Sequence, residues 1–135
     1  MKIVLDTNVF VSGIFFKGPP HRILRAWRDG RITLVYSRAI LAEYERVLDE
    51  LGREFPAVDG GPFLDLLRRY GELVHPHTSR QFTCRDPDDV KFIDCLVESK
   101  ARCLVTGDKD LLQTDLKTPA ILTPRQFCER YLPAQ

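Results

Sequence analysis

The first six residues, MKIVLD (residues 1–6), contain a short apolar run that ends directly in Asp6. A continuous run of branched aliphatic residues that is too short for a helix predicts a strand covered on both faces of a sheet. A second run of this kind, CLV (103–105), leads through a Thr-Gly pair into Asp108. One aspartate at a strand end is more often a turn residue. Two of them favour a shared pocket, because the carboxyl ends of parallel strands lie on one edge of the sheet.

Outward from these two runs, short apolar segments alternate with helical patterns along the chain. Three further segments are typical of strands, at 33–36, 73–74 and 120–122. The expected helices are 20–29, 38–54, 61–71, 88–100 and 124–132. Strands that alternate with helices of this length predict βαβ units and a mainly parallel sheet. We therefore expect an α/β protein with one domain over residues 1–135.

Two of the expected helices begin with recognisable capping residues. Ser37 is suited to the N-cap of the helix over 38–54, because a serine hydroxyl accepts a bond from a free backbone amide. Thr123 and Pro124 suit the N-cap and the first turn of the last helix.

Composition is that of an ordinary soluble globular protein, with 44% hydrophobic and 29% charged residues and a net charge of +1. This charge neither predicts nor excludes a nucleic-acid partner. The apolar runs are too short to cross a bilayer, and Asp6 stands where a signal peptide needs its apolar region. We expect a cytoplasmic protein that does not bind membranes.

The four cysteines show no C-x-x-C pair and no zinc-site spacing. Three of them lie in apolar segments, where a free thiol behaves as a small hydrophobic group. We expect reduced thiols in the core. The cysteines are Cys84, Cys95, Cys103 and Cys128.

The stretch DPDD (86–89) begins the helix expected over 88–100. Capping and the helix dipole explain Asp86 and Asp88. Asp89 is different, because helical spacing places it near the middle of the apolar arc formed by Phe92, Ile93 and Leu96. An inward carboxylate is costly unless a group pairs with it or it coordinates a metal. Asp89 is therefore a third candidate for the acidic pocket.

The helix over 38–54 contributes an acid that its periodicity does not identify. Glu43 lies on one rim of the apolar arc and Glu45 on the other. On this pattern alone, a solvated position is at least as consistent with each glutamate as a place in the acidic pocket.

Several acids that converge without a basic partner would repel one another and raise their pKa values. A divalent cation removes this repulsion, and oxygen ligands suit Mg²⁺ or Mn²⁺. Such a site can activate a water molecule and neutralise charge on a reacting phosphate. The three histidines form no rival ligand set, and the chain has no glycine-rich phosphate loop. Metal-activated water is the chemistry that these residues favour.

Four segments together closely resemble the PIN-domain family, in the branch described as toxin components of toxin–antitoxin systems. They are MKIVLDTNVFVSG (1–13), LAEYERVL (41–48), DPDDVKFIDCLVESKARCLVTGDKDLL (86–112) and ILTPRQF (121–127). The segments occur in the expected order over nearly the whole chain. The resemblance implies an α/β/α sandwich with a central, mainly parallel five-stranded sheet. It also implies a Mg²⁺- or Mn²⁺-dependent ribonuclease.

The resemblance also assigns the site residues. It selects Glu43 over Glu45 and implies that Asn8 shapes the pocket and that Thr106 holds the neighbouring loop or touches a metal-bound water or phosphate. The acids that it implies as catalytic residues and metal ligands are Asp6, Glu43, Asp89 and Asp108. Asp86, Asp88 and Asp110 are close enough in sequence to assist, although Asp110 could instead cap a short helix beginning at Leu111.

The leading hypothesis is an endoribonuclease that hydrolyses RNA phosphodiester bonds by metal-activated water, as the toxin of a toxin–antitoxin pair. The resemblance implies a cognate antitoxin protein and a homodimer. The dimer contact could involve the apolar residues Ile14, Phe15 and Phe16, which are equally suited to the core. Arg22, Arg25 and Lys109 could contact RNA phosphates, although charges at helical spacing are more often a solvated face.

Two other functional classes fit the sequence less well. The alternative is a catalytically silent PIN-type module that binds RNA or protein, which the presence of all four acids disfavours. A phosphoacceptor receiver or phosphatase is disfavoured because Asp6-Thr7-Asn8 lacks the second acid of the common phosphatase motif.

Overall fold

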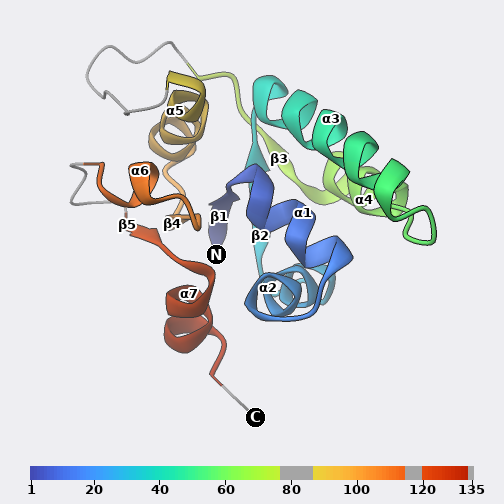
Figure 1. Cartoon of the computed structure of the whole chain (residues 1–135). Coiled ribbons are helices and arrows are strands. Elements are labelled where there is room, and N and C mark those ends of the chain that lie inside the picture. The colour runs from blue at the N-terminus through green and yellow to red at the C-terminus, as the bar shows by residue number, and fades with distance from the viewer. Residues whose placement is uncertain (77–86, 115–119, 134–135) are drawn as a thin grey trace.

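A computed structural model of the chain describes residues 1–76, 87–114 and 120–133 (Figure 1). Five strands form one sheet in the order β3-β2-β1-β4-β5, and every pair of neighbours is parallel. The strands are β1 (Lys2–Leu5), β2 (Thr33–Tyr36), β3 (Glu72–Leu73), β4 (Cys103–Val105) and β5 (Ala120–Leu122). The predicted α/β/α sandwich with a five-stranded sheet is confirmed. The sheet is all-parallel rather than mainly parallel.

The helices flank this sheet and connect its strands (Figure 1). They are α1 (Thr7–Phe15), α2 (Pro19–Arg28), α3 (Arg38–Glu54), α4 (Gly61–Tyr70), the 3₁₀ turn η1 (Pro87–Asp89), α5 (Val90–Ser99), α6 (Lys109–Leu112) and α7 (Pro124–Tyr131). Helix α5 packs against β1, β2 and β4, and α2 packs against α1 and α7.

Strand β1 lies at the centre of the sheet and determines where the candidate acids meet. Ile3 is in register with Leu34 of β2 on one side and with Cys103 of β4 on the other. Leu5 is in register with Val105. The strands β1 and β4 therefore end side by side, and the residues that follow them lie at the same edge.

Helix α1 was not among the expected helices. Its nine residues include the β-branched Val9, Val11 and Ile14, which lower helix propensity, and no polar stripe divides buried from exposed positions. The helix is instead stabilised by packing against α2 and α3. The close approach to α2 occurs at Gly13, where a Cβ would lie 2.7 Å from the carbonyl oxygen of Pro20.

The expected caps are confirmed. The Ser37 hydroxyl accepts a 3.3 Å hydrogen bond from the amide of Ile40. Thr123 and Gln126 form a reciprocal capping box at the start of α7. One expected strand is displaced by a residue, because β3 covers Glu72–Leu73 rather than 73–74.

The core extends along both sides of β1. Phe10 of α1 stacks on Tyr44 of α3, with ring centroids 4.2 Å apart. The predicted reduced core thiols are confirmed for three cysteines, Cys95, Cys103 and Cys128, which are free and buried. Cys84 lies outside the described residues. Within the described ranges no helix combines the length and apolar character that a membrane span requires.

Ile14 and Phe15 are half-buried and pack against the core. Phe16 is 50% exposed and contacts Phe55 edge-on, with ring centroids 5.6 Å apart. Two of the three apolar residues considered for a dimer contact are thus largely used within the chain.

Candidate active site

Asp6 links the central strand to the first helix. It directly follows β1, and its backbone amide donates a 3.0 Å hydrogen bond to the carbonyl of Val105 in β4. The side chain is 6% exposed, and its Oδ2 accepts a 2.7 Å hydrogen bond from the Thr106 hydroxyl. Asp6 is therefore a buried carboxylate held at the carboxyl edge of the sheet.

Thr106 joins the two acids that follow β1 and β4. Its side chain is fully buried, and its Oγ1 donates to Asp6 while accepting a 2.9 Å bond from the amide of Asp108. Asp108 in turn accepts a 2.8 Å bond at Oδ1 from the amide of Asp110. The Asp6 carboxylate and the backbone amide of Asp108 thus meet at one threonine hydroxyl.

Asp108, and not Asp110, caps the short helix that follows β4. Helix α6 begins at Lys109, and Asp108 is its N-cap. The expectation that Asp110 caps a helix beginning at Leu111 is wrong, because Asp110 lies inside the helix and supplies the capped amide.

Glu43 of α3 reaches the same region as Asp6. Its Oε2 accepts a hydrogen bond from the hydroxyl of Thr7, which directly follows Asp6. Glu45 instead lies on the exposed side of α3, where it forms a 3.0 Å ion pair with Arg68. The structure therefore places Glu43, and not Glu45, beside the strand-end acids.

Lys91 is a residue of this region that the sequence reasoning did not include. Its ammonium lies 2.8 Å from Glu43 Oε1 and donates a 2.6 Å hydrogen bond to the carbonyl of Asp88. The premise that the acids converge without a basic partner is therefore wrong. Helical spacing alone does not indicate this contact, because it depends on how α3 and α5 pack together.

Asp89 is buried, 8% exposed, at the junction of η1 and α5. This agrees with its predicted place on the apolar side of the helix. Asp88 beside it is exposed, and Asp86 lies outside the described residues. Asn8 is exposed on the first turn of α1.

The surroundings of Asp6 and Glu43 shift their pKa values in opposite directions. Burial raises the pKa of Asp6, and the charges of Asp108 and Glu43 add to this increase, whereas hydrogen bonds from Thr106 and the Thr7 backbone oppose it. Burial also acts to raise the pKa of Glu43. The hydrogen bonds from Lys91 and Thr7 and the charge of Lys91 outweigh that effect, so the pKa of Glu43 is lowered. Of these two acids, Asp6 is the one whose negative charge is less well compensated by its surroundings.

The donor atoms at this edge suit a hard divalent cation, because they are carboxylate and hydroxyl oxygens. Within residues 1–76, 87–114 and 120–133, however, no three His, Cys, Asp or Glu side chains are grouped as metal ligands. The Lys91 ammonium, which is paired with Glu43, already places one positive charge in this region. The oxygen atoms of these residues fit Mg²⁺ or Mn²⁺ in their chemistry.

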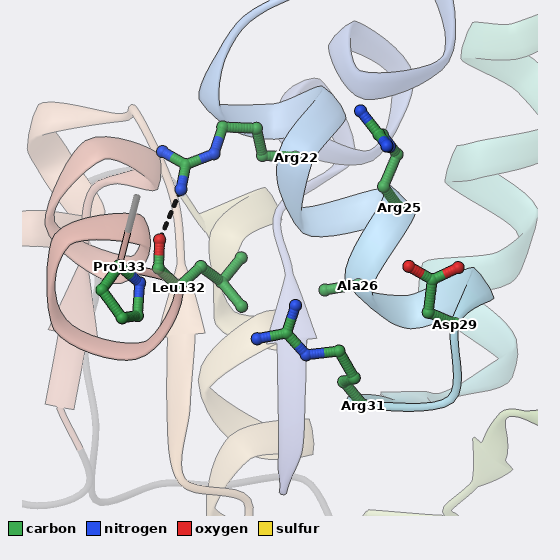
Figure 2. Close-up of a pocket in the computed structure, with 7 residues that line it drawn as sticks. All are labelled: Arg22, Arg25, Ala26, Asp29, Arg31, Leu132 and Pro133. Carbon is green, nitrogen blue, oxygen red and sulfur yellow. Dashed lines mark hydrogen bonds between the residues drawn. The ribbon is translucent and has the colours of Figure 1, made fainter. Parts of the chain in front are cut away.

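A second charged feature lies at the opposite edge of the sheet. It is a hollow of about 360 Å³ lined by Arg22, Arg25, Ala26, Asp29, Arg31, Leu132 and Pro133. Figure 2 shows the Arg22 guanidinium bonded to the Leu132 carbonyl. Arg31 precedes β2, whose first residue Thr33 pairs with Lys2, so the hollow is at the amino edge. Arg22 and Arg25 therefore do not extend the acidic pocket.

A family model described as PIN domain matches residues 2–110. The chain belongs to the PIN-domain family. PIN domains are generally nucleases. An uncharacterized protein, MJ1680, of Methanocaldococcus jannaschii is 32% identical over 97% of this chain and 92% of its own length.

Among solved structures, the chain is similar to a chain in the crystal structure of VapBC2 from Rickettsia felis bound to a DNA fragment from their promoter. The TM-score is 0.59 with 17% identity, over 90% of this chain and 97% of the other. At this identity the likeness supports the PIN fold alone. The matched range of the family model includes all four candidate acids of this PIN domain.

Proposed function

We propose that this PIN domain is a metal-dependent endoribonuclease formed by one domain over residues 1–135. The observation that carries the proposal is the Thr106 hydroxyl, which contacts both Asp6 and the backbone of Asp108 at the carboxyl edge of the sheet. This edge is where open α/β sheets bind ligands. A buried acid with a raised pKa at such a place is typical of a functional site.

In the proposed site, Asp6, Asp89 and Asp108 would hold Mg²⁺ or Mn²⁺, and Glu43 would bind the metal or orient the attacking water. The cation supplies charge neutralisation for the phosphate and increases the acidity of a coordinated water. Thr106 fixes the Asp6 carboxylate through its hydroxyl, and Thr7 fixes Glu43. Asn8, exposed beside Asp6, is available to contact substrate.

The biological setting that we propose is that of a cytoplasmic toxin with a cognate antitoxin protein, acting as a homodimer. The support is the toxin-branch resemblance of the sequence motifs, together with the fold shared with the VapBC2 chain. An antitoxin that inserts a basic side chain among the acids would offset the desolvation of Asp6 and its repulsion by Asp108 and Glu43.

The test is cleavage of end-labelled RNA with Mg²⁺ or Mn²⁺ by the wild type and by Asp6→Asn and Asp108→Asn. Both variants preserve side-chain shape and remove a charge, so we expect at least about a hundredfold loss. A matched control is Asp29→Asn, which removes an exposed acid at the amino edge and should cleave normally. Equal activity in Asp6→Asn and wild type would reject the proposal.

The second candidate is a catalytically silent module that binds RNA or protein. One observation favours it: no three potential ligands are grouped in the described part of the chain. RNA binding without metal-dependent cleavage, unchanged in Asp6→Asn, would support this candidate.

A further inference from the structure

The Lys91 ammonium is held from three sides. It contacts Glu43 Oε1 at 2.8 Å and the Asp88 carbonyl at 2.6 Å, and it lies 5.2 Å from the ring centroid of Phe92. A cation over an aromatic ring gains additional stabilisation. Lys91 is thus fixed in one place at the entrance to α5.

This ion pair is more enclosed than an ordinary surface pair. The side chains of Lys91 and Glu43 are 20% and 21% exposed, whereas those of the Lys2–Glu72 pair are 48% and 37% exposed. Reduced exposure lowers solvent screening and strengthens the interaction. The Lys91–Glu43 pair is therefore able to influence the other charges of the pocket.

Both oxygens of Glu43 are engaged. Oε1 contacts Lys91, and Oε2 accepts the Thr7 hydroxyl. A divalent cation at Glu43 would meet the positive charge of Lys91, and the two cations would repel each other.

We propose that Lys91 is a built-in counter-ion of the acidic pocket, which holds Glu43 in the metal-free protein and which a divalent cation must displace from Glu43. Lys91 is then a positioning residue that acts through Glu43 and lowers the metal affinity of the site. This inference rests on the proposed metal-dependent function. The positive charge of Lys91 partly neutralises the acids of the pocket and reduces their mutual repulsion.

The experiment measures Mn²⁺ binding to the purified full chain by calorimetry, for wild type and Lys91→Met. Methionine keeps the aliphatic contact and removes the charge, so we expect at least about tenfold tighter binding. The thermal midpoint without metal should fall. Lys2→Met, which removes a lysine from an ion pair at the amino edge, is the matched control and should bind Mn²⁺ as the wild type does.

Two further variants separate charge from a general structural effect. Lys91→Arg retains the charge and should keep wild-type affinity, whereas Lys91→Gln should behave as Lys91→Met even if the methionine variant is unstable. In a Glu43→Gln background, Lys91→Met should increase the Mn²⁺ affinity by a smaller factor, because the partner of the ammonium is no longer charged.

Unchanged or weaker Mn²⁺ binding by both neutral variants would overturn the inference. If the wild type meanwhile binds Mn²⁺ and cleaves RNA, the proposed function stands and only the role of Lys91 is refuted. If neither the wild type nor the neutral variants bind Mn²⁺ and RNA is not cut, both are refuted.

Discussion

The hydroxyl of Thr106 lies 2.7 Å from Asp6 Oδ2, so a residue at the end of β4 fixes a carboxylate 100 residues earlier in the chain. The same oxygen accepts the amide of Asp108. One buried hydroxyl therefore sets the orientation of one candidate acid and the backbone of another.

Removal of this hydroxyl should weaken the fold and raise the pKa of Asp6 further. Thr106→Val keeps the shape of the side chain but leaves the Asp6 carboxylate and the Asp108 amide without their partner. We expect a loss of about 1–3 kcal/mol in the free energy of unfolding, measured by urea denaturation. Thr106→Ser, which retains the hydroxyl, should lose less; no loss in Thr106→Val would show that the hydrogen bonds of the hydroxyl do not stabilise the fold.

The free energy of unfolding should depend on pH in the way that the raised pKa of Asp6 dictates. Its pKa is raised in the folded state from 3.8, so its contribution to stability is fully present below that value and is lost as pH rises through the folded pKa. Asparagine does not titrate, so the Asp6→Asn variant does not show this loss of stability as pH rises. The variant should gain stability relative to wild type as pH rises above about 4, measured by urea unfolding with chelator present.

The pKa of Glu43 is shifted in the opposite direction to that of Asp6, so the same experiment should give the opposite pH dependence. Its pKa is lowered from 4.5, so its contribution is present above that value and is lost as pH falls. Glu43→Gln should therefore lose stability relative to wild type at neutral pH and approach it in acid. Parallel pH profiles of the two variants would contradict this assignment of opposite shifts.

Tyr44 supports the strand that carries Asp6. Its hydroxyl donates a 2.5 Å hydrogen bond to the carbonyl of Leu5 while its ring stacks on Phe10. Tyr44→Phe keeps the stack and removes the bond, so we expect about 1–2 kcal/mol lower stability by thermal or urea unfolding. Tyr44→Leu also removes the ring contact and should lose more; a smaller loss in the leucine variant would exclude the stacking contribution.

Two glycines should respond to alanine with opposite signs. At Gly13 a Cβ would lie 2.7 Å from the Pro20 carbonyl and 2.8 Å from Leu24, so Gly13→Ala should destabilise by about 1–3 kcal/mol. At Gly52, within α3, nothing lies within 4 Å of the added Cβ. Gly52→Ala should stabilise by about 0.5–1 kcal/mol. Urea midpoints check both, and a shared sign would refute the packing argument.

The sheet and most helices could be predicted because their signals are local. The runs that became β1 and β4 are short, apolar and bounded by polar residues, and Ser37 and Thr123 mark helix starts. Helix α1 could not be predicted in this way, because its β-branched residues disfavour a helix and its packing against α2 and α3 is not a local signal.

The site residues also differ in whether a local signal predicts them. The juxtaposition of Asp6 and Asp108 follows from parallel strands, and the burial of Asp89 follows from helical periodicity. Periodicity did not separate Glu43 from Glu45, and it gave no sign that Lys91 faces Glu43. Those contacts depend on how α3 and α5 pack together, which a single sequence does not express.

The central place of β1 has a consequence for synthesis of the protein. β1 is translated well before one of its two sheet neighbours, β4, which begins only at Cys103. Non-local pairing of this kind forms late in folding. A nascent or prematurely terminated chain therefore carries Asp6 but has no Thr106 to orient it and no Asp108 beside it. If the pocket cuts RNA, the order of translation itself keeps it inactive until β4, Thr106 and Asp108 have been made.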